Sequence, residues 1–136
     1  MKILVIDGQG GRLGGQLVKS ISTALPDAEL IAIGTNTIAT ECMLKAGARA
    51  AATGENAVIV NCRTADVIAG PLGIAMADSL LGEITPAMAN AVAASNAMRV
   101  LIPMNLCSTY VAGVNNSVSA MIEDAVAHMK ALALKG

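Results

Sequence analysis

The segment KILVIDGQGGRLGGQL, from Lys2 to Leu17, joins an apolar run of strand length to a cluster of glycines. Apolar residues at helical spacing follow at once, beginning at Leu13 and Leu17. This is the order of parts at the start of a nucleotide-binding β-α-β unit. Glycine lets the backbone turn sharply and approach a phosphate, and the free amides at the start of the next helix attract anions. The segment therefore predicts an anion pocket and leaves any reaction open.

The glycines of this segment have an unusual spacing. Gly8, Gly10 and Gly14 form G-x-G-x-x-x-G, one residue longer than the common dinucleotide motif, while Gly11 and Gly14 supply its G-x-x-G ending. The alternative is that the glycines only permit a tight turn and close packing. If the loop binds a cofactor, the predicted contacts are Asp7, Gly8, Gln9, Gly10, Gly11, Arg12, Leu13 and Gly14.

The rest of the chain alternates between strand and helix patterns, with the central strands apolar on both faces. This favours one α/β domain over residues 1–136, a Rossmann-like, doubly wound, mainly parallel sheet with helices on both faces. The order of the strands stays open, and a flavodoxin-like order is an alternative. Strands are expected over residues 2–7, 29–33, 48–52, 66–69, 99–103 and 109–114, and helices over residues 13–25, 36–46, about 54–62, 86–96 and 117–134.

Composition excludes several classes of protein. The net charge is −1 without any run of lysine or arginine, which argues against nucleic-acid binding. The apolar runs are much shorter than the roughly 20 residues of a membrane span, and the first is too short for a signal peptide, so a cytoplasmic protein without membrane contact is expected. The 3 cysteines are far apart and predict reduced thiols and no metal site.

Tyr110 is the only aromatic residue, so the core is built from small and aliphatic side chains and methionine. Such a core buries little area per residue, and a domain of this kind gains stability by covering a further face with a partner. We therefore expect a homo-oligomer, with a dimer favoured.

Three further segments follow predicted strands and are expected at the same rim of the sheet as the glycine loop. They contain Gly34, Thr35 and Asn36, then Gly70 and Pro71, and finally Asn105. Each set is also explained by ordinary turn chemistry.

An acidic residue usually lies about 20 residues after the loop, where it holds the ribose of NAD. This chain has Gly34-Thr35-Asn36 there. Without this acid, the ligand is NADP, with Arg12, Thr35 and Asn36 at its 2′-phosphate, or it is NAD or another phosphate-bearing nucleotide. The remaining alternative is that the site binds no ligand. Asp7 is unexpected beside a phosphate; it either caps loop amides or contacts a ligand hydroxyl or a metal carried by the phosphates.

The loop GQGGRLGGQL, residues 8–17, resembles the NAD(P)-binding loop of dihydrodipicolinate reductases. That resemblance implies cofactor binding and no activity, since the histidine-rich segment and second domain of those enzymes have no counterpart here. Over its whole length the chain resembles a small uncharacterised bacterial family catalogued as a domain of unknown function. The segments that carry this resemblance are residues 6–11, 34–40, 52–56 and 82–86.

Three functions fit these observations. The first is a nucleotide-binding protein, with NAD(P) or another nucleotide, acting as a non-catalytic cofactor-binding or sensor module. The second is a small NADP-dependent oxidoreductase with an active site completed at a dimer interface, and the third is an interaction scaffold that has lost its ligand. No catalytic residue is predicted; candidate proton donors are Asn105, Cys107, Tyr110 and Glu83, although Glu83 is also explained by the positive end of the following helix.

Overall fold

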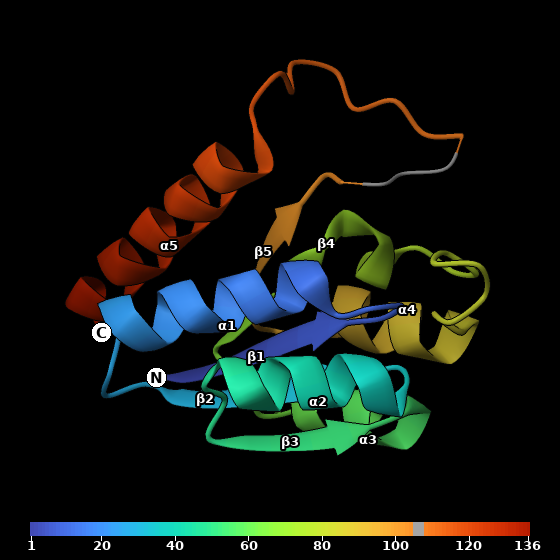
Figure 1. Cartoon of the computed structure of the whole chain (residues 1–136), viewed down its shortest axis with the longest axis horizontal. Coiled ribbons are helices and arrows are strands. Elements are labelled where there is room, and N and C mark those ends of the chain that lie inside the picture. Colours follow the sequence, from blue (N-terminus) through green and yellow to red (C-terminus); the bar gives the residue numbers. More distant parts are fainter. Residues whose placement is uncertain (105–107) are drawn as a thin grey trace.

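The computed structural model describes residues 1–104 and 108–136, which form a five-stranded sheet with helices on both faces (Figure 1). The predicted α/β doubly wound fold is confirmed. The strands are β1 (Lys2–Asp7), β2 (Glu29–Gly34), β3 (Ala50–Thr53), β4 (Val67–Pro71) and β5 (Met98–Ile102). The helices are α1 (Arg12–Ala24), α2 (Thr37–Ala46), α3 (Glu55–Cys62), α4 (Pro86–Ala94) and α5 (Val118–Lys135), with a 3-10 helix η1 (Leu72–Ala75) after β4.

The strands lie in the order β3-β2-β1-β4-β5, and every neighbouring pair is parallel. This order corresponds to the Rossmann arrangement and differs from the flavodoxin-like one, in which β2 lies at an edge. The chain builds outward from β1, first toward β3 and then, after crossing the sheet, toward β5. The carboxyl ends of β1 and β4 therefore form the point where the winding reverses, and ligands of such sheets bind there.

The β1 strand is buried on both faces. Ile3 and Val5 pack into a core cluster beneath α1, α2 and α5, whereas Leu4 and Ile6 pack into a second cluster beneath α3 and α4. Figure 1 shows α1, α2 and α5 on the near face of the sheet. Because successive side chains of a strand point to opposite faces, a strand covered on both sides has an unbroken apolar sequence. Burial on both faces therefore explains why residues 3–6, near the start of the chain, are all apolar.

The helix ends follow local sequence signals. The Thr85 side chain accepts a hydrogen bond from the Met88 amide, and Pro86 is the first residue of α4, as expected of a threonine cap followed by proline. Asn36 caps α2 in the same way through the Ala39 amide. Observed boundaries differ from the predicted ones by one or two residues for most elements, which is within the normal fraying of helix and strand ends.

One predicted strand is wrong. Residues 109–114 form no strand, and most of residues 108–117 are exposed on an arm that extends away from the sheet (Figure 1). Tyr110 and Val111 favour extended backbone locally. A strand, however, also needs a neighbouring strand and a buried face, and this segment neither pairs with the edge strand β5 nor buries its side chains.

Close packing of α1 against the end of β1 requires glycine at position 14. A Cβ atom there would lie 2.6 Å from Sδ of Met43 and 2.7 Å from Cβ of Asp7. Met43 is fully buried and Asp7 belongs to the central strand, so neither side chain has free space into which it can withdraw.

We predict that Gly14→Ala lowers the free energy of unfolding by about 1 kcal/mol, because an overpacking penalty of about 1–3 kcal/mol is only partly offset by a gain of at most about 1 kcal/mol in helix propensity. Urea denaturation measures this. Gln16→Ala, at an exposed position of the same helix, is the matched control and should change the value by less than about 0.5 kcal/mol. A Gly14→Ala protein as stable as the wild type would show that the close approach is not required.

Candidate functional site

A cavity of about 340 Å³ lies at the carboxyl ends of β1 and β4, where the winding of the sheet reverses. Ligands of doubly wound sheets bind at this place, and the volume is at the lower end of the range for small-molecule sites. Its lining consists of the loop after β1, the end of β4 and residues from two further loops: Asp7, Gly8, Gln9, Gly10, Gly11, Arg12, Leu13, Pro71, Leu80 and Met104.

Two of the loop glycines are needed for the fold. Gly11 has a left-handed backbone (φ 71°), and a Cβ atom there would lie 2.7 Å from Cα of Ala39 in α2. At Gly8 a Cβ atom would lie 2.6 Å from Oγ1 of Thr35. The loop closes with a hydrogen bond from the Gly11 amide to the Gly8 carbonyl, 2.9 Å long. Turn geometry and packing therefore explain these two glycines without a ligand.

Gly10 is different. It has no left-handed backbone, and a Cβ atom at this position would meet nothing within 4 Å. Every other glycine in the loop and at the start of α1 has a neighbour in that range. The space in front of Gly10 is thus open, on a residue that lines the cavity.

Asp7 is buried, with 5% of its surface exposed, and caps the start of α1. Its Oδ2 accepts a hydrogen bond of 2.7 Å from the Gly14 amide, and its Oδ1 accepts one of 2.8 Å from the Gly8 amide. The residue before the helix, Gly11, has no side chain with which to cap it. Of the two interpretations of Asp7, the structure shows the capping of loop amides, which also places a negative charge at the positive end of the helix.

Burial raises the pKa of Asp7 above its ordinary value. The hydrogen bonds from the Gly14 and Gly8 amides act in the opposite direction, and the negative charge of Glu83 adds to the increase. Desolvation is the largest of these effects.

Three backbone amides around the cavity remain free of acceptors. Within the part of the chain that the structure describes, the amides of Gly10, Arg12 and Leu13 make no hydrogen bond to protein. The last two belong to the first turn of α1, where unpaired amides carry the positive end of the helix dipole. The Arg12 side chain is exposed beside them. This group of amides and one guanidinium is suited to an anion.

The contacts of Glu83 differ from the position at the start of α4 that the sequence suggested. Its Oε1 accepts hydrogen bonds from Oγ1 of Thr35 (2.6 Å) and Nδ2 of Asn36 (2.7 Å). The Gln9 amide donates to both carboxylate oxygens, at 3.1 and 3.2 Å. Glu83 therefore ties the glycine loop to the end of β2 and does not act at the start of α4. No local signal marks this role, because the partners are far away in sequence.

Partial burial by itself raises the pKa of Glu83, but the hydrogen bonds from Thr35, Asn36 and the Gln9 amide outweigh it. The pKa of Glu83 consequently lies below its ordinary value, and the group is a carboxylate at neutral pH. A general acid needs the opposite shift, so this environment does not suit the proton donor considered above.

Thr35 and Asn36, predicted to contact a 2′-phosphate, have a protein partner in the structure. Both side chains donate to the Glu83 carboxylate, and the Asn36 amide nitrogen also donates to the Gln9 carbonyl. A phosphate at this place would meet a negative charge. Gly34 is explained by packing alone, since a Cβ atom would collide with Thr40.

Of the remaining predicted residues, one lines the cavity and the others do not or lie outside the described residues. Pro71 lines the cavity, whereas Gly70 is required by packing because a Cβ atom there would collide with the Ile6 carbonyl oxygen of the neighbouring strand. Asn105 and Cys107 lie outside the described residues. Tyr110 is 89% exposed on the arm and contributes nothing to the cavity lining.

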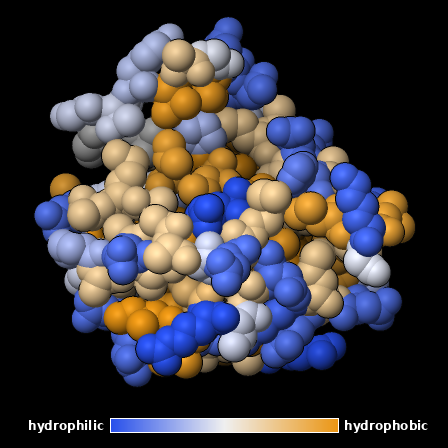
Figure 2. Space-filling model, turned by 180° about the vertical axis from the view of Figure 1, so that it is seen from behind, coloured by the Kyte–Doolittle hydropathy of each residue, from blue (hydrophilic) through white to orange (hydrophobic). Residues whose placement is uncertain are grey.

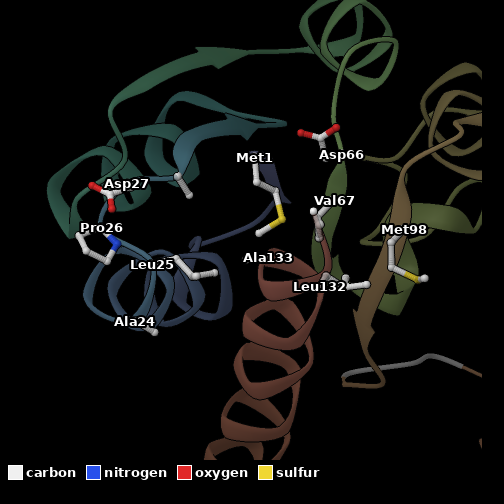
Figure 3. Close-up of a pocket in the computed structure, with 12 residues that line it drawn as sticks. Met1, Ala24, Leu25, Pro26, Asp27, Asp66, Val67, Met98, Leu132 and Ala133 are labelled. Atoms are coloured by element: carbon white, nitrogen blue, oxygen red, sulfur yellow. The ribbon is translucent and has the colours of Figure 1, made fainter.

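A larger cavity, of about 640 Å³, lies at the other end of the strands, on the side of their amino ends (Figure 3). It is bordered by the start of β1 and β4 and by the end of α5, with Met1, Val67, Met98 and Leu132 among its lining side chains. The lining is mostly aliphatic, and no helix start points free amides into it. We therefore place the functional site at the glycine loop despite its smaller volume.

No group of three or more His, Cys, Asp or Glu side chains in residues 1–104 and 108–136 is placed to hold a metal ion. Over the same residues, no helix has the length and apolar character needed to cross a bilayer.

Comparison with known proteins identifies the family. Residues 2–134 match the family described as a domain of unknown function, DUF3842, and the chain belongs to this family. This confirms the predicted resemblance to an uncharacterised family. No curated protein matches the sequence.

The fold is similar to the crystal structure of a dodecameric, FMN-dependent UbiX-like decarboxylase from Escherichia coli O157:H7. The TM-score is 0.50 at 17% sequence identity, and the match covers 94% of this chain and 91% of that chain. At this identity the likeness concerns the fold alone. The neighbour is not a dihydrodipicolinate reductase, and the resemblance to those enzymes rests on the residues of the glycine loop.

We predict that Asp7 gives the stability a pH dependence of definite sign. Because its pKa in the folded protein lies above the ordinary value of 3.8, the folded state binds more protons than the unfolded chain between the two values. The contribution of Asp7 to the free energy of unfolding therefore falls as the pH rises from about 3.8 through the raised pKa, and is constant above it.

The measurement is urea denaturation of the wild type and of Asp7→Asn at several pH values. Asparagine does not titrate, so the difference between the two free energies of unfolding isolates Asp7. We expect wild type minus variant to decrease with increasing pH in this interval. A difference that increases would show that the amide hydrogen bonds outweigh desolvation.

Proposed function

We propose that this protein binds a phosphate-bearing nucleotide, with a phosphate on the loop formed by residues 8–13. The observation that carries this proposal is Gly10. Neither packing nor backbone conformation requires glycine there, and a Cβ atom would meet only open space at a residue that lines the cavity. A glycine at such a position permits close approach of a ligand to the backbone.

The surrounding groups support an anionic ligand. The amides of Gly10, Arg12 and Leu13 are unpaired among the described residues, and the Arg12 guanidinium provides a positive charge. Asp7 does not oppose this arrangement strongly, because each of its oxygens faces an amide of the protein. The loop and the helix start together then bind the two carboxylate oxygens of Asp7 on their inner side and a phosphate on their outer side.

The identity of the nucleotide is inferred from Glu83 and from the structural neighbour. The comparisons do not support the NAD(P) predicted from the sequence, and the carboxylate of Glu83 disfavours NADP. The UbiX-like neighbour is described as FMN-dependent. FMN has the single phosphate that this loop suits, and we propose it as the first ligand to test.

We propose binding, rather than catalysis, as the main role of the site. Asp7 and Arg12 are the only ionisable residues among those that line the cavity in the described structure. Asp7 is committed to two amides, and Arg12 does not exchange protons near neutral pH. A sensor or cofactor-carrying module needs no further groups, whereas an oxidoreductase needs a donor supplied from elsewhere.

We predict that nucleotide binding depends on Gly10. Thermal unfolding is measured with FMN, NAD, NADP, ATP and coenzyme A, and a ligand at 100 times its Kd should stabilise the wild type by about 2.7 kcal/mol. Gly10→Val should abolish the shift, because its branched side chain occupies the place of the phosphate. Without ligand it should unfold near the wild-type temperature, because a Cβ atom at this position meets no neighbour.

Ala127→Val, on an exposed position of α5 far along the chain, is the matched control and should keep the full ligand shift. Retention of the shift in Gly10→Val would contradict the phosphate position. Absence of a shift with every nucleotide in the wild type would contradict nucleotide binding and favour the interaction scaffold.

We also propose that the chain forms a homo-oligomer, as its composition predicted. Seen from the side of α3 and α4, apolar residues cover much of the middle of the surface (Figure 2). Leu81, Tyr110 and Leu134 are 91%, 89% and 89% exposed in the single chain. Light scattering coupled to gel filtration should give a mass of at least twice 13.6 kDa; a monomeric mass at micromolar concentration would contradict this.

A further inference from the structure

The end of β2 and the glycine loop together form a second set of hydrogen-bond donors. It comprises the Gln9 amide, the Thr35 hydroxyl and the Asn36 side-chain amide, and all three donate to one carboxylate, that of Glu83. The chain thus supplies its own anion to this set. The donors are suited to an anion or a polar ligand group, because Glu83 itself shows that they converge on one.

This donor set lies where half of a dinucleotide would lie. In doubly wound sheets, the adenosine ribose of a dinucleotide bound to the glycine loop lies over the end of β2. Thr35 follows β2 directly, and its amide is bonded to the Asp7 carbonyl at 3.0 Å, next to the loop. Glu83 and the ribose would therefore compete for the same place.

The segment that carries Glu83, residues 76–85 between η1 and α4, is held tightly in position. Asp78, Leu80 and Leu81 have left-handed backbone conformations (φ 64°, 55° and 55°), followed by Gly82 at 89°. The Asp78 amide donates to the Ile84 carbonyl at 2.7 Å, which closes the segment on itself. We call it the Glu83 loop. Left-handed non-glycine residues occur where the surroundings fix them, often at ligand sites.

On the other side of the glycine loop, the cavity reaches the end of β4 among the described residues. Pro71 at the end of β4 and Met104 after β5 line the cavity, and neither carries a charge. Leu80 of the Glu83 loop forms the wall between the two sides, since its Cδ1 would lie 3.0 Å from a Cβ atom at Gly8. Among the described residues, the cavity therefore extends from the glycine loop toward β4, whereas Leu80 and the Glu83 carboxylate occupy the β2 side.

We propose that Glu83 closes the β2 side of the site, so that the protein binds nucleoside or flavin monophosphates and excludes dinucleotides. This inference rests on the proposed phosphate site and adds the class of ligand. A dinucleotide must displace the carboxylate from its three donors, whereas a monophosphate leaves them in place. Two negatively charged groups, the Glu83 carboxylate and the second phosphate, also repel each other on the β2 side.

The test compares FMN with FAD and nicotinamide mononucleotide with NAD, by titration calorimetry on the full chain. Each pair shares one phosphate-bearing half. In the wild type, the monophosphate is expected to bind at least tenfold more tightly than the dinucleotide of its pair. In Glu83→Ala, the preference should fall by at least tenfold, because the three donors become available to the second half.

Glu55→Ala is the matched control. The Glu55 carboxylate accepts a hydrogen bond of 2.7 Å from Thr85 at the end of the Glu83 loop, so this variant removes one acidic tether of the same loop and leaves the donor set occupied. Its preference should equal that of the wild type. If Glu83→Ala does not fold, Glu83→Gln keeps the side-chain length, loses the charge and one acceptor oxygen, and should shift the preference in the same direction.

The two proposals fail in different ways. If no monophosphate or dinucleotide binds to the wild type or to any variant, the phosphate site itself is wrong. If nucleotides bind but the dinucleotides bind as tightly as the monophosphates, or if Glu83→Ala leaves the preference unchanged, the phosphate site stands and the role of Glu83 is overturned.

Discussion

The carboxylate of Asp7 is the interaction on which the architecture of the site depends. It lies at the end of the central strand and accepts hydrogen bonds from the Gly8 and Gly14 amides, which belong to the loop and to the first turn of α1. Strand, loop and helix are therefore fixed relative to one another by a single side chain. A buried carboxylate is costly by itself, and two amide hydrogen bonds together with the helix dipole offset that cost.

Asp7 fixes the loop, and the hydrogen-bond partners of the other loop amides determine what the site binds. The Gly11 amide closes the turn onto the Gly8 carbonyl, and the Gln9 amide is taken by Glu83. The unpaired amides that remain in the described loop and helix start belong to Gly10, Arg12 and Leu13. The protein satisfies the inner and β2-facing donors internally and leaves the outward donors to a ligand or to water. This division of the amides, rather than the glycine motif itself, determines the side of the loop on which a ligand binds.

The sequence predicted the β1-loop-α1 unit well because its signals are local: an apolar strand buried on both faces, glycines at the turn and helical spacing directly afterwards. Strand order was not predictable, since it depends on which strands pair across the sheet. Glycine spacing also does not separate Gly10, with its open space, from Gly8, Gly11 and Gly14, whose hydrogens face packed neighbours.

The role of Glu83 in the site was not predictable from local sequence patterns either. Its partners Thr35 and Gln9 lie 48 and 74 residues away in the chain, and only the folded topology brings them together. A carboxylate does lie near the end of β2, but it comes from another loop and accepts hydrogen bonds from Gln9, Thr35 and Asn36. A residue type at a fixed spacing after the glycine loop does not reveal such a carboxylate.

An acid on a loop has a consequence that an acid on a strand does not have. A carboxylate carried by β2 would be part of the rigid sheet, whereas Glu83 belongs to a segment with consecutive left-handed leucines at positions 80 and 81. Each such residue stores about 1–3 kcal/mol, and each hydrogen bond to a charged group contributes about 1.5–3 kcal/mol to keeping the loop closed. Strain and hydrogen bonding are thus of the same order and act in opposite directions. The Glu83 loop is thus held by the contacts of the Glu83 carboxylate together with its internal hydrogen bonds, such as that from the Asp78 amide to the Ile84 carbonyl, and these contacts offset the strain of its left-handed residues.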